Sequence, residues 1–456
     1  MVDSSSIIDR LTSFVGALTL EDVPPAVVDE ARRCVLDTLG VIVAGQKTGL
    51  ARAVMEHSQQ TYRDGRSHIL GTGIAMQAVG ATLVNAAAGH AYDFDDTSYT
   101  GIMHGSVAVL PAAFAMAEQQ GAGGKKLLEG FIAGVEVEYA MAEYCTTHLY
   151  YKGWWTSGVY APLGAAAAAA RILGLDAYQT ANAMSIAVGN SSGMKVSFGS
   201  DAKPLGIGMA ASTGVESALL AAAGLTGPNK VFEGKNGFLS LFNGNQHSTE
   251  TDLQLGDKWR LTDPGILFKS FPVCSAALAG AELVARLLER HQIKPSDVVE
   301  VTCEVPPLVG ISLIYDHPES IREAQFSMPY AVGCILAYGD INLEHLTEDV
   351  LSQPELQQHM QKVTMQVPDY LKNDATVLLR CPEGAGITIT TRSNQQFSDF
   401  LDRPTGMPGN PVSDDALENK FCACFRHGGL PGEQALRVAE RIWRLETIDD
   451  LSGLLD

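Results

Sequence analysis

The sequence predicts a mainly α-helical protein, with a large all-helical domain and a smaller α+β domain. Segments rich in Ala and Gly, with apolar residues at helical spacing, dominate residues 1–269. Alternating apolar and polar residues, which are typical of half-buried strands, are confined to residues 270–402. The helical pattern returns in residues 403–456, which we assign to the large domain. A chain of 456 residues is long enough for two domains.

The large domain is predicted to consist of helices. Residues 25–44 repeat apolar side chains at helical spacing. Residues 164–175 and 208–227 are rich in Ala and Gly, so helices there can pack closely, and each stops at a glycine. The uncharged run 67–92 is long enough to span a bilayer, but its Asn, Gln and His residues favour a buried helix of a soluble protein.

The smaller domain is predicted to mix helices and strands. Residues 276–293 and 326–339 carry helical patterns. Strands are predicted where apolar and polar residues alternate, at 297–306, 362–369, 375–381 and 386–392. The tail resumes a helix at "DDALENKFCACF".

The charge balance limits the partners of the protein. The formal net charge is −20, which argues against nucleic acid and against an anionic membrane as partners. An anionic substrate would therefore need a locally basic pocket. The eight cysteines form no C-x-x-C pair and are expected as thiols in a reducing compartment. Because the N-terminal "MVDSSSIIDRL" has early acidic residues and no long apolar stretch, we expect no signal peptide and a cytoplasmic protein.

The stretch "GHAYDFDDTSYTGIMHG" (residues 89–105) places three aspartates and two histidines between uncharged segments. Here His104 is a candidate general base, since an imidazole can gain or lose a proton near neutrality. An equally good interpretation is that "DFDDT" caps a helix and His104 satisfies backbone groups. A metal site is a third option, although no paired ligand spacing supports it.

Three further residues are candidates for binding or catalysis. Lys203 precedes Pro204 at the start of a Gly-rich helix, where it could hold a carboxylate or a phosphate, or lie solvated on the surface. Lys269 falls at the predicted domain junction, where ligand sites are common. Tyr330 is either a functional hydroxyl or a core aromatic whose hydroxyl is satisfied.

Five blocks in this order resemble the MmgE/PrpD family, which includes 2-methylcitrate dehydratase, cis-aconitate decarboxylase and iminodisuccinate epimerase. The blocks are "GHAYDFDDT" with "HGSVAVLPAAFA", "AKPLGIGMAASTGVESALLAAAGLTGP", "KSFPVCSAALAGAE", "EAQFSMPYAVGCIL" and "RPTGMPGNPVSDDALENKF". The resemblance covers essentially the whole chain. It implies that the smaller domain is a lid, that the active site lies between the domains, and that the protein is a homodimer needing neither a metal nor an organic cofactor. The positions that match the family's active site are Asp93, Thr97, His104, Lys203, Lys269 and Tyr330.

The sequence departs from the family pattern at three places. Trp155 in "GWWTSG" stands where members typically carry a histidine, and Gly206 replaces the histidine of "K-P-L-H-x-G". Cys274 aligns with a histidine of decarboxylase-like members. The indole could shrink the pocket or stack on a planar group, or it could be a packing replacement in a site that still performs the family reaction. Fewer imidazoles suggest a substrate less anionic than citrate, or a reaction of a single proton transfer.

The chemistry implied by the resemblance is removal of a proton next to a carboxylate. We expect His104 to carry the proton, Lys203 and Lys269 to hold the carboxylate, and Asp93 and Thr97 to orient the substrate or His104. We expect Tyr330 to act as a second acid or base. Among the other departures, Trp155 and Cys274 are expected to contact the substrate.

We rank a hydro-lyase first, namely a dehydratase of a 2-methylcitrate-like hydroxy di- or tricarboxylate. An epimerase or isomerase of a dicarboxylate comes second and a cis-aconitate-type decarboxylase third. A different class of function is a non-catalytic carboxylate-binding member of the family. In each case the expected partner is a small carboxylate, with no nucleic acid and no membrane.

Overall fold

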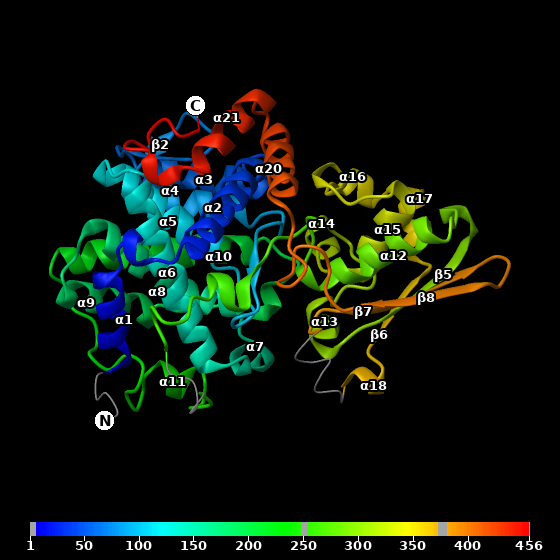
Figure 1. The fold of residues 1–456 in the computed structure, drawn as a ribbon, viewed down its shortest axis with the longest axis horizontal. Coiled ribbons are helices and arrows are strands. Elements are labelled where there is room, and N and C mark those ends of the chain that lie inside the picture. Colours follow the sequence, from blue (N-terminus) through cyan, green and yellow to red (C-terminus); the bar gives the residue numbers. More distant parts are fainter. Residues whose placement is uncertain (1–5, 248–252, 373–380, 456) are drawn as a thin grey trace.

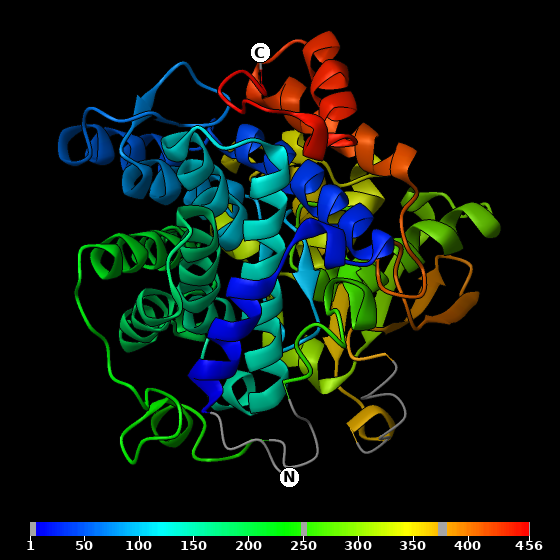
Figure 2. The same cartoon turned by 60° about the vertical axis from the view of Figure 1, so that its left-hand side comes forward.

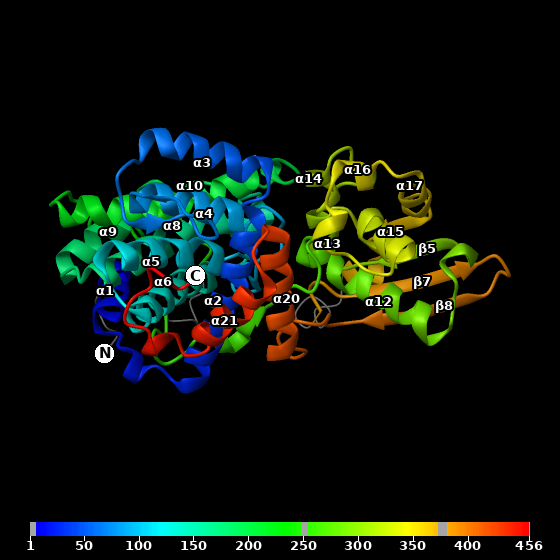
Figure 3. The same ribbon diagram turned by 90° about the horizontal axis from the view of Figure 1, so that it is seen from above.

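A computed structural model describes residues 6–247, 253–372 and 381–455 of the chain. Most of the described elements are helices, so the mainly α prediction is confirmed. The long helices gather in one part of the molecule and the main sheet lies in another (Figure 1). Both parts are visible side by side from above (Figure 3).

The helical part is built from helices that pack closely because small residues line their contacts. Gly214, for example, faces another helix so closely that a Cβ there would lie 2.7 Å from the carbonyl oxygen of Pro162. The N-terminal helix α1 lies along the outside, next to α6 and α9 (Figure 2). The helices are α1 (Ile7–Ala17), α2 (Pro25–Gly45), α3 (Gly49–Thr61), α4 (Ala78–Gly89), α5 (Ser106–Gln120), α6 (Gly124–Cys145), α7 (His148–Lys152), α8 (Thr156–Leu173), α9 (Ala177–Gly189), α10 (Ala202–Ala222) and α11 (Phe238–Leu241).

The helices predicted at 25–44, 164–175 and 208–227 are confirmed as α2 and as parts of α8 and α10. The prediction of one helix over 67–92 is wrong in its first part. The strands β1 (Ser67–His68) and β2 (Ala75–Met76) pair there, and the helix α4 begins only at Ala78. The reason is the "GTG" turn, in which Gly71 has a φ of +79° that no helix interior accommodates. The helix α4 itself is buried throughout, as predicted.

The main sheet has four strands in the order β6–β5–β7–β8. The central strand β5 (Val298–Glu304) runs parallel to β6 (Val363–Gln366) and antiparallel to β7 (Ala385–Thr391), which pairs with β8 (Gln396–Leu401). The predicted strands 297–306, 362–369 and 386–392 are thereby confirmed. The predicted strand 375–381 lies, except for Cys381, outside the described residues. The edge strand β8 was not predicted, because most of its side chains are exposed and the alternation is weak.

Helices cover the sheet and lead the chain back to the helical part. The helices α12 (Leu278–Arg290) and α15 (Met328–Tyr338) confirm two predictions and pack against strands of the sheet. The short helices are α13 (Pro307–Ser312), α14 (Ile321–Ala324), α16 (Glu348–Leu351), α17 (Pro354–Met360) and α18 (Asp369–Lys372). The C-terminal helices α20 (Asp414–Gly428) and α21 (Gly432–Ile442) then pack against α2, among the helices of the N-terminal half (Figure 1). That the sheet-bearing part acts as a lid stays a prediction, and so does the homodimer.

Among the described residues, the helix α10 is the only one whose length and mean hydropathy would let it cross a membrane. Half of its apolar window is buried against the rest of the protein. A core helix of a globular protein passes the same test, so this is weak evidence for a membrane span.

Candidate active site

The acidic stretch forms the connection between α4 and α5. Within it, β3 (Thr97–Ser98) pairs with β4 (Ile266–Leu267), with Thr97 opposite Leu267. This pairing brings the acidic stretch next to Lys269, although the two are far apart in the sequence. Asp93 has a φ of +50°, so the chain turns sharply there before it enters β3. The short sheet therefore explains why these two predicted residues meet.

Asp93 is the anion to which both predicted lysines bind. Lys203 donates to Oδ1 of Asp93, while Lys269 donates to Oδ2 at 2.9 Å and to the backbone carbonyl of Asp93 at 2.5 Å. All three side chains are buried. Burial alone would raise the pKa of Asp93, but the two ammonium groups hold it well below its usual range. Lys203 and Lys269, which were predicted to bind a carboxylate of the substrate, thus already bind a carboxylate of the protein. Only the ammonium hydrogens that Asp93 does not use are left for a substrate.

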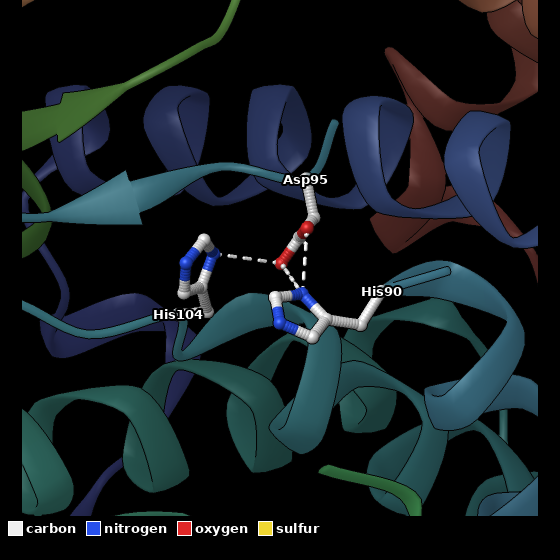
Figure 4. A group of neighbouring side chains, drawn as sticks. All are labelled: His90, Asp95 and His104. Atoms are coloured by element: carbon white, nitrogen blue, oxygen red, sulfur yellow. Dashed lines mark hydrogen bonds and ion pairs between the residues drawn. The ribbon is translucent and has the colours of Figure 1, made fainter. Parts of the chain in front are cut away.

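Asp95 joins two imidazoles (Figure 4). Its carboxylate lies 2.8 Å from Nδ1 of His90 and 2.9 Å from Nδ1 of His104. Burial lowers the pKa of His90 to about 4, so this ring is neutral. Lys203 donates to Nε2 of His90 at 2.7 Å, which assigns the proton of His90 to Nδ1. Asp95 therefore accepts a hydrogen bond from His90.

The second imidazole is oriented in the same way. Nδ1 of His104 lies 2.9 Å from Asp95 and 3.0 Å from the backbone carbonyl of Asp96. Two acceptors around Nδ1 require its proton there, so the lone pair of His104 is on Nε2. Burial would raise the pKa of Asp95, yet its interactions with the two imidazoles, which include a hydrogen bond from each, lower it well below its usual range. A carboxylate that holds an imidazole in one tautomer is how many enzymes orient a general base.

His90, Asp95 and His104 are the one group within the described residues whose atoms could together hold a metal ion. Their geometry suits hydrogen bonds better. The ligand atoms of a tetrahedral zinc ion lie about 2.0–2.2 Å from it and so about 3.3–3.6 Å from one another, which is further than the 2.8 and 2.9 Å that separate Asp95 from His90 and His104.

A small cavity of about 30 Å³ lies beside these residues. It is lined by six of the predicted site residues, namely Asp93, Thr97, His104, Trp155, Lys203 and Cys274. Lys269 lies behind Asp93 and lines a larger cavity of about 580 Å³ instead. The small cavity has room for one or two water molecules, so a carboxylic acid enters only if its walls move.

Tyr330 does not join this group. Its side chain is fully buried, and its hydroxyl donates to the backbone carbonyl of His345 at 2.8 Å. Tyr330 is absent from the cavity wall. These contacts fit the alternative interpretation of a core aromatic with a satisfied hydroxyl, and they give no support to an acid or base role.

Three residues of the site were not predicted. His90 and Asp95 lie in the acidic stretch, but only their meeting in space assigns them a role. Glu383 lines the cavity and accepts hydrogen bonds from Tyr99 at 2.7 Å and from Ser275 at 3.0 Å. Burial raises the pKa of Glu383, which favours the protonated acid. Its sequence context, "CPEGAG", carries no pattern that would have marked it.

Trp155 forms one wall of the cavity. Its ring stacks on His90 with centroids 5.7 Å apart and planes inclined by 20°, and it meets Phe198 edge-on. The residue is the N-cap of α8 and is 3% exposed. The indole of Trp155 therefore takes up space at the cavity wall and packs against His90, the imidazole that contacts Lys203.

Comparison with known proteins identifies the family. Human cis-aconitate decarboxylase is 28% identical over 430 residues, covering 92% of this chain and 87% of the human protein. The mouse enzyme of the same name is 27% identical, covering 99% and 93%. Cis-aconitate decarboxylase of Aspergillus terreus is 22% identical, covering 99% and 96%. Residues 9–251 match the MmgE/PrpD N-terminal domain and residues 271–445 match the MmgE/PrpD C-terminal domain, so the chain belongs to the MmgE/PrpD family.

Proposed function

We propose that the protein is a lyase that needs no cofactor, removes the proton next to a carboxylate of a small hydroxy di- or tricarboxylate, and eliminates water. One observation carries this proposal. His104, fixed by Asp95 with its lone pair on Nε2, lines the same small cavity as Lys203. A base and a cation that converge on one small cavity are what a weak carbon acid requires.

The steps follow from the hydrogen bonds. The lone pair on Nε2 of His104 takes the proton from carbon, and the electron pair of the broken C–H bond moves toward the carboxylate. Lys203 stabilises the negative charge that develops there, since Asp93 and His90 leave one of its hydrogens unused. The electron pair then forms the double bond as the hydroxyl leaves. Glu383, which burial favours as the protonated acid, gives this hydroxyl its proton so that it departs as water.

A cavity of this size requires an opening step before an acid can enter, and the residues in contact across it would have to separate. The hydroxyl of Tyr150 lies 2.9 Å from that of Ser312, and Tyr315 donates to the backbone carbonyl of Phe198 at 2.9 Å. In both pairs one residue precedes the sheet-bearing part and the other belongs to it. We therefore propose that the sheet-bearing part moves as a lid, as in other enzymes that close over a substrate.

Decarboxylation is the second candidate, because the three relatives described above are named cis-aconitate decarboxylases. In that reaction a C–C bond breaks, carbon dioxide leaves, and the protonated His104 returns a proton to carbon. The same residues would serve both reactions, with a different bond aligned. Cys274, at a position where decarboxylase-like members are expected to carry an imidazole, favours dehydration over decarboxylation. Trp155, where family members typically carry a histidine, favours a smaller acid.

The test is incubation of the protein with a panel of hydroxy and unsaturated di- and tricarboxylic acids in D₂O, followed by NMR. Loss of water from a hydroxy acid supports the proposal, whereas release of carbon dioxide from cis-aconitate supports the second candidate. Deuterium incorporation with inversion alone would indicate an epimerase. His104→Gln and Lys203→Met should each remove the observed reaction, because loss of a positioned base or of its charge partner costs about 10²–10⁴-fold. Turnover that survives His104→Gln would contradict the proposal.

A further inference from the structure

Lys195 lies beside the small cavity, and the proposed reaction gives this cation no role. It begins a short 3₁₀ turn (Lys195–Ser197) ahead of α10 and is half-buried. Its ammonium nitrogen lies 3.7 Å from the ring centroid of Tyr150 and 6.0 Å from that of Phe198. Both rings line the small cavity. Lys195 therefore lies directly behind part of the cavity wall.

The charge of Lys195 has no carboxylate partner in the part of the chain that the structure describes. Within the described ranges no carboxylate lies at ion-pair distance from its ammonium group, whereas Lys203 and Lys269 are both bound to Asp93. Burial lowers the pKa of Lys195 to about 8, which leaves most molecules protonated at pH 7. The aromatic faces give a protonated ammonium group some stabilisation, but less than a carboxylate would.

The backbone holds Lys195 in place. Its N–H donates to the carbonyl of Gly153 at 3.0 Å, and Trp154 and Met194 form an isolated antiparallel bridge. The segment is thus fixed to the chain that carries Trp155. The Phe198 ring also has Lys203 nearby, with its ammonium nitrogen 5.3 Å from the centroid. Two ammonium groups hence lie near the same ring, one bound to Asp93 and one without an anion among the described residues.

We propose that Lys195 binds the second carboxylate of a dicarboxylate substrate whose first carboxylate lies against Lys203. This inference rests on the proposed function and assigns a residue to the second carboxylate of its substrate. The ammonium group lies over Tyr150 in the free protein and turns to the incoming carboxylate when the cavity opens. A lysine stem has enough rotatable bonds for that movement.

The experiment measures binding rather than turnover, with succinate and butyrate as probes and ligand-observed NMR titrations as readout. Four proteins are compared: the wild type, Lys195→Met, Lys195→Arg and Lys152→Met, which removes the same charge at an exposed lysine nearby. We expect Lys195→Met to weaken succinate binding about 10- to 100-fold, as loss of a charge-assisted hydrogen bond does. Butyrate, which has one carboxylate, should be unaffected. Lys195→Arg should keep most of the succinate affinity, and Lys152→Met all of it.

Three results would overturn the inference. These are equal weakening of both probes by Lys195→Met, no weakening of either, and no binding of succinate to the wild type. Because no turnover is needed, its outcome is separate from that of the proposed function. A protein that binds succinate through Lys195 but transforms no acid in the panel would retain this inference and lose the proposed lyase activity.

Discussion

The indole of Trp155 occupies the space that a side chain at position 206 would need. A Cβ built on Gly206 would lie 3.0 Å from Cζ3 of Trp155. The indole has little freedom to yield, since it stacks on His90 and meets Phe198 edge-on. Two departures from the family pattern, the tryptophan at 155 and the glycine at 206, are therefore one structural change.

This contact predicts that Gly206→Ala destabilises the protein, although alanine is ordinarily the better residue in a helix. Overpacking a filled site costs about 1–3 kcal/mol, against a gain of about 0.5–1 kcal/mol from helix propensity. We expect the free energy of unfolding, measured by urea denaturation, to fall by about 1–2 kcal/mol.

The matched control is Gly16→Ala, at an exposed helical glycine with no atom within 4 Å of the added Cβ, which should stabilise instead. In the background of Trp155→His, where the large ring is gone, Gly206→Ala should also stabilise. A destabilisation of the same size in both backgrounds would show that Trp155 and Gly206 are not coupled.

The two adjacent aspartates should differ sharply in their effect on catalysis. Asp95→Asn places an amide where the carboxylate accepts from two imidazoles, so His104 loses its fixed tautomer. We expect kcat to fall about 10²–10⁴-fold with little change in KM. Steady-state kinetics on whichever acid the panel identifies would measure this.

Asp96→Asn is the control for that substitution. Burial and the nearby Asp37 raise the pKa of Asp96 well above its usual range, which favours the neutral acid, and an amide resembles that form. Activity should remain within a few-fold of the wild type. Similar losses of activity in Asp95→Asn and Asp96→Asn would mean that both substitutions lower activity only by disturbing the fold.

Stability should depend on pH through His90. The folded protein keeps this imidazole neutral down to about pH 4, whereas an unfolded histidine binds a proton near 6.5. The contribution of His90 to stability is thus present above pH 6.5 and is lost as the pH falls toward 4, at up to about 1.4 kcal/mol per pH unit.

Urea denaturation between pH 7.5 and 4.5 would check this. The slope of unfolding free energy against pH should be smaller in His90→Asn than in the wild type by up to about 1.4 kcal/mol per pH unit, which corresponds to one bound proton. His57→Asn, at an exposed histidine of α3, should leave the slope unchanged. Equal slopes in the wild type and His90→Asn would contradict a neutral, buried His90.

Chelation should leave the activity intact. The carboxylate of Asp95 already lies at hydrogen-bond distance from His90 and from His104, which is closer than two ligands of one tetrahedral zinc ion lie to each other. We expect full turnover after dialysis against EDTA. Lost activity that a single divalent ion restores would instead make these three side chains metal ligands.

Periodic patterns were enough to predict most of the fold, but they could not reveal which residues meet. Helices such as α2 and α15 carry their burial pattern in the sequence, whereas β8 is an exposed edge strand with little pattern to find. His104 and Asp93 were identifiable from an unusual polar stretch. The roles of His90, Glu383 and Lys195 depend on contacts between segments distant in the chain, which no local pattern contains. Tyr330 shows the converse error. Its position matches an active-site position of the family, but its hydroxyl donates to the backbone carbonyl of His345 in the core.

The small volume of the cavity also bears on the fate of the hydrogen that His104 removes. Because the cavity has room for only one or two water molecules, we expect the protonated imidazole to exchange its hydrogen slowly with solvent until the cavity opens. The hydrogen should then return to the same carbon in many abortive cycles, and substrate recovered from D₂O should carry little deuterium even where proton removal is fast and reversible. A substrate deuterated at the reacting carbon, followed in ordinary water, should likewise keep its label in the unreacted fraction. Rapid wash-out of that label would mean that the cavity stays open to solvent during the reaction.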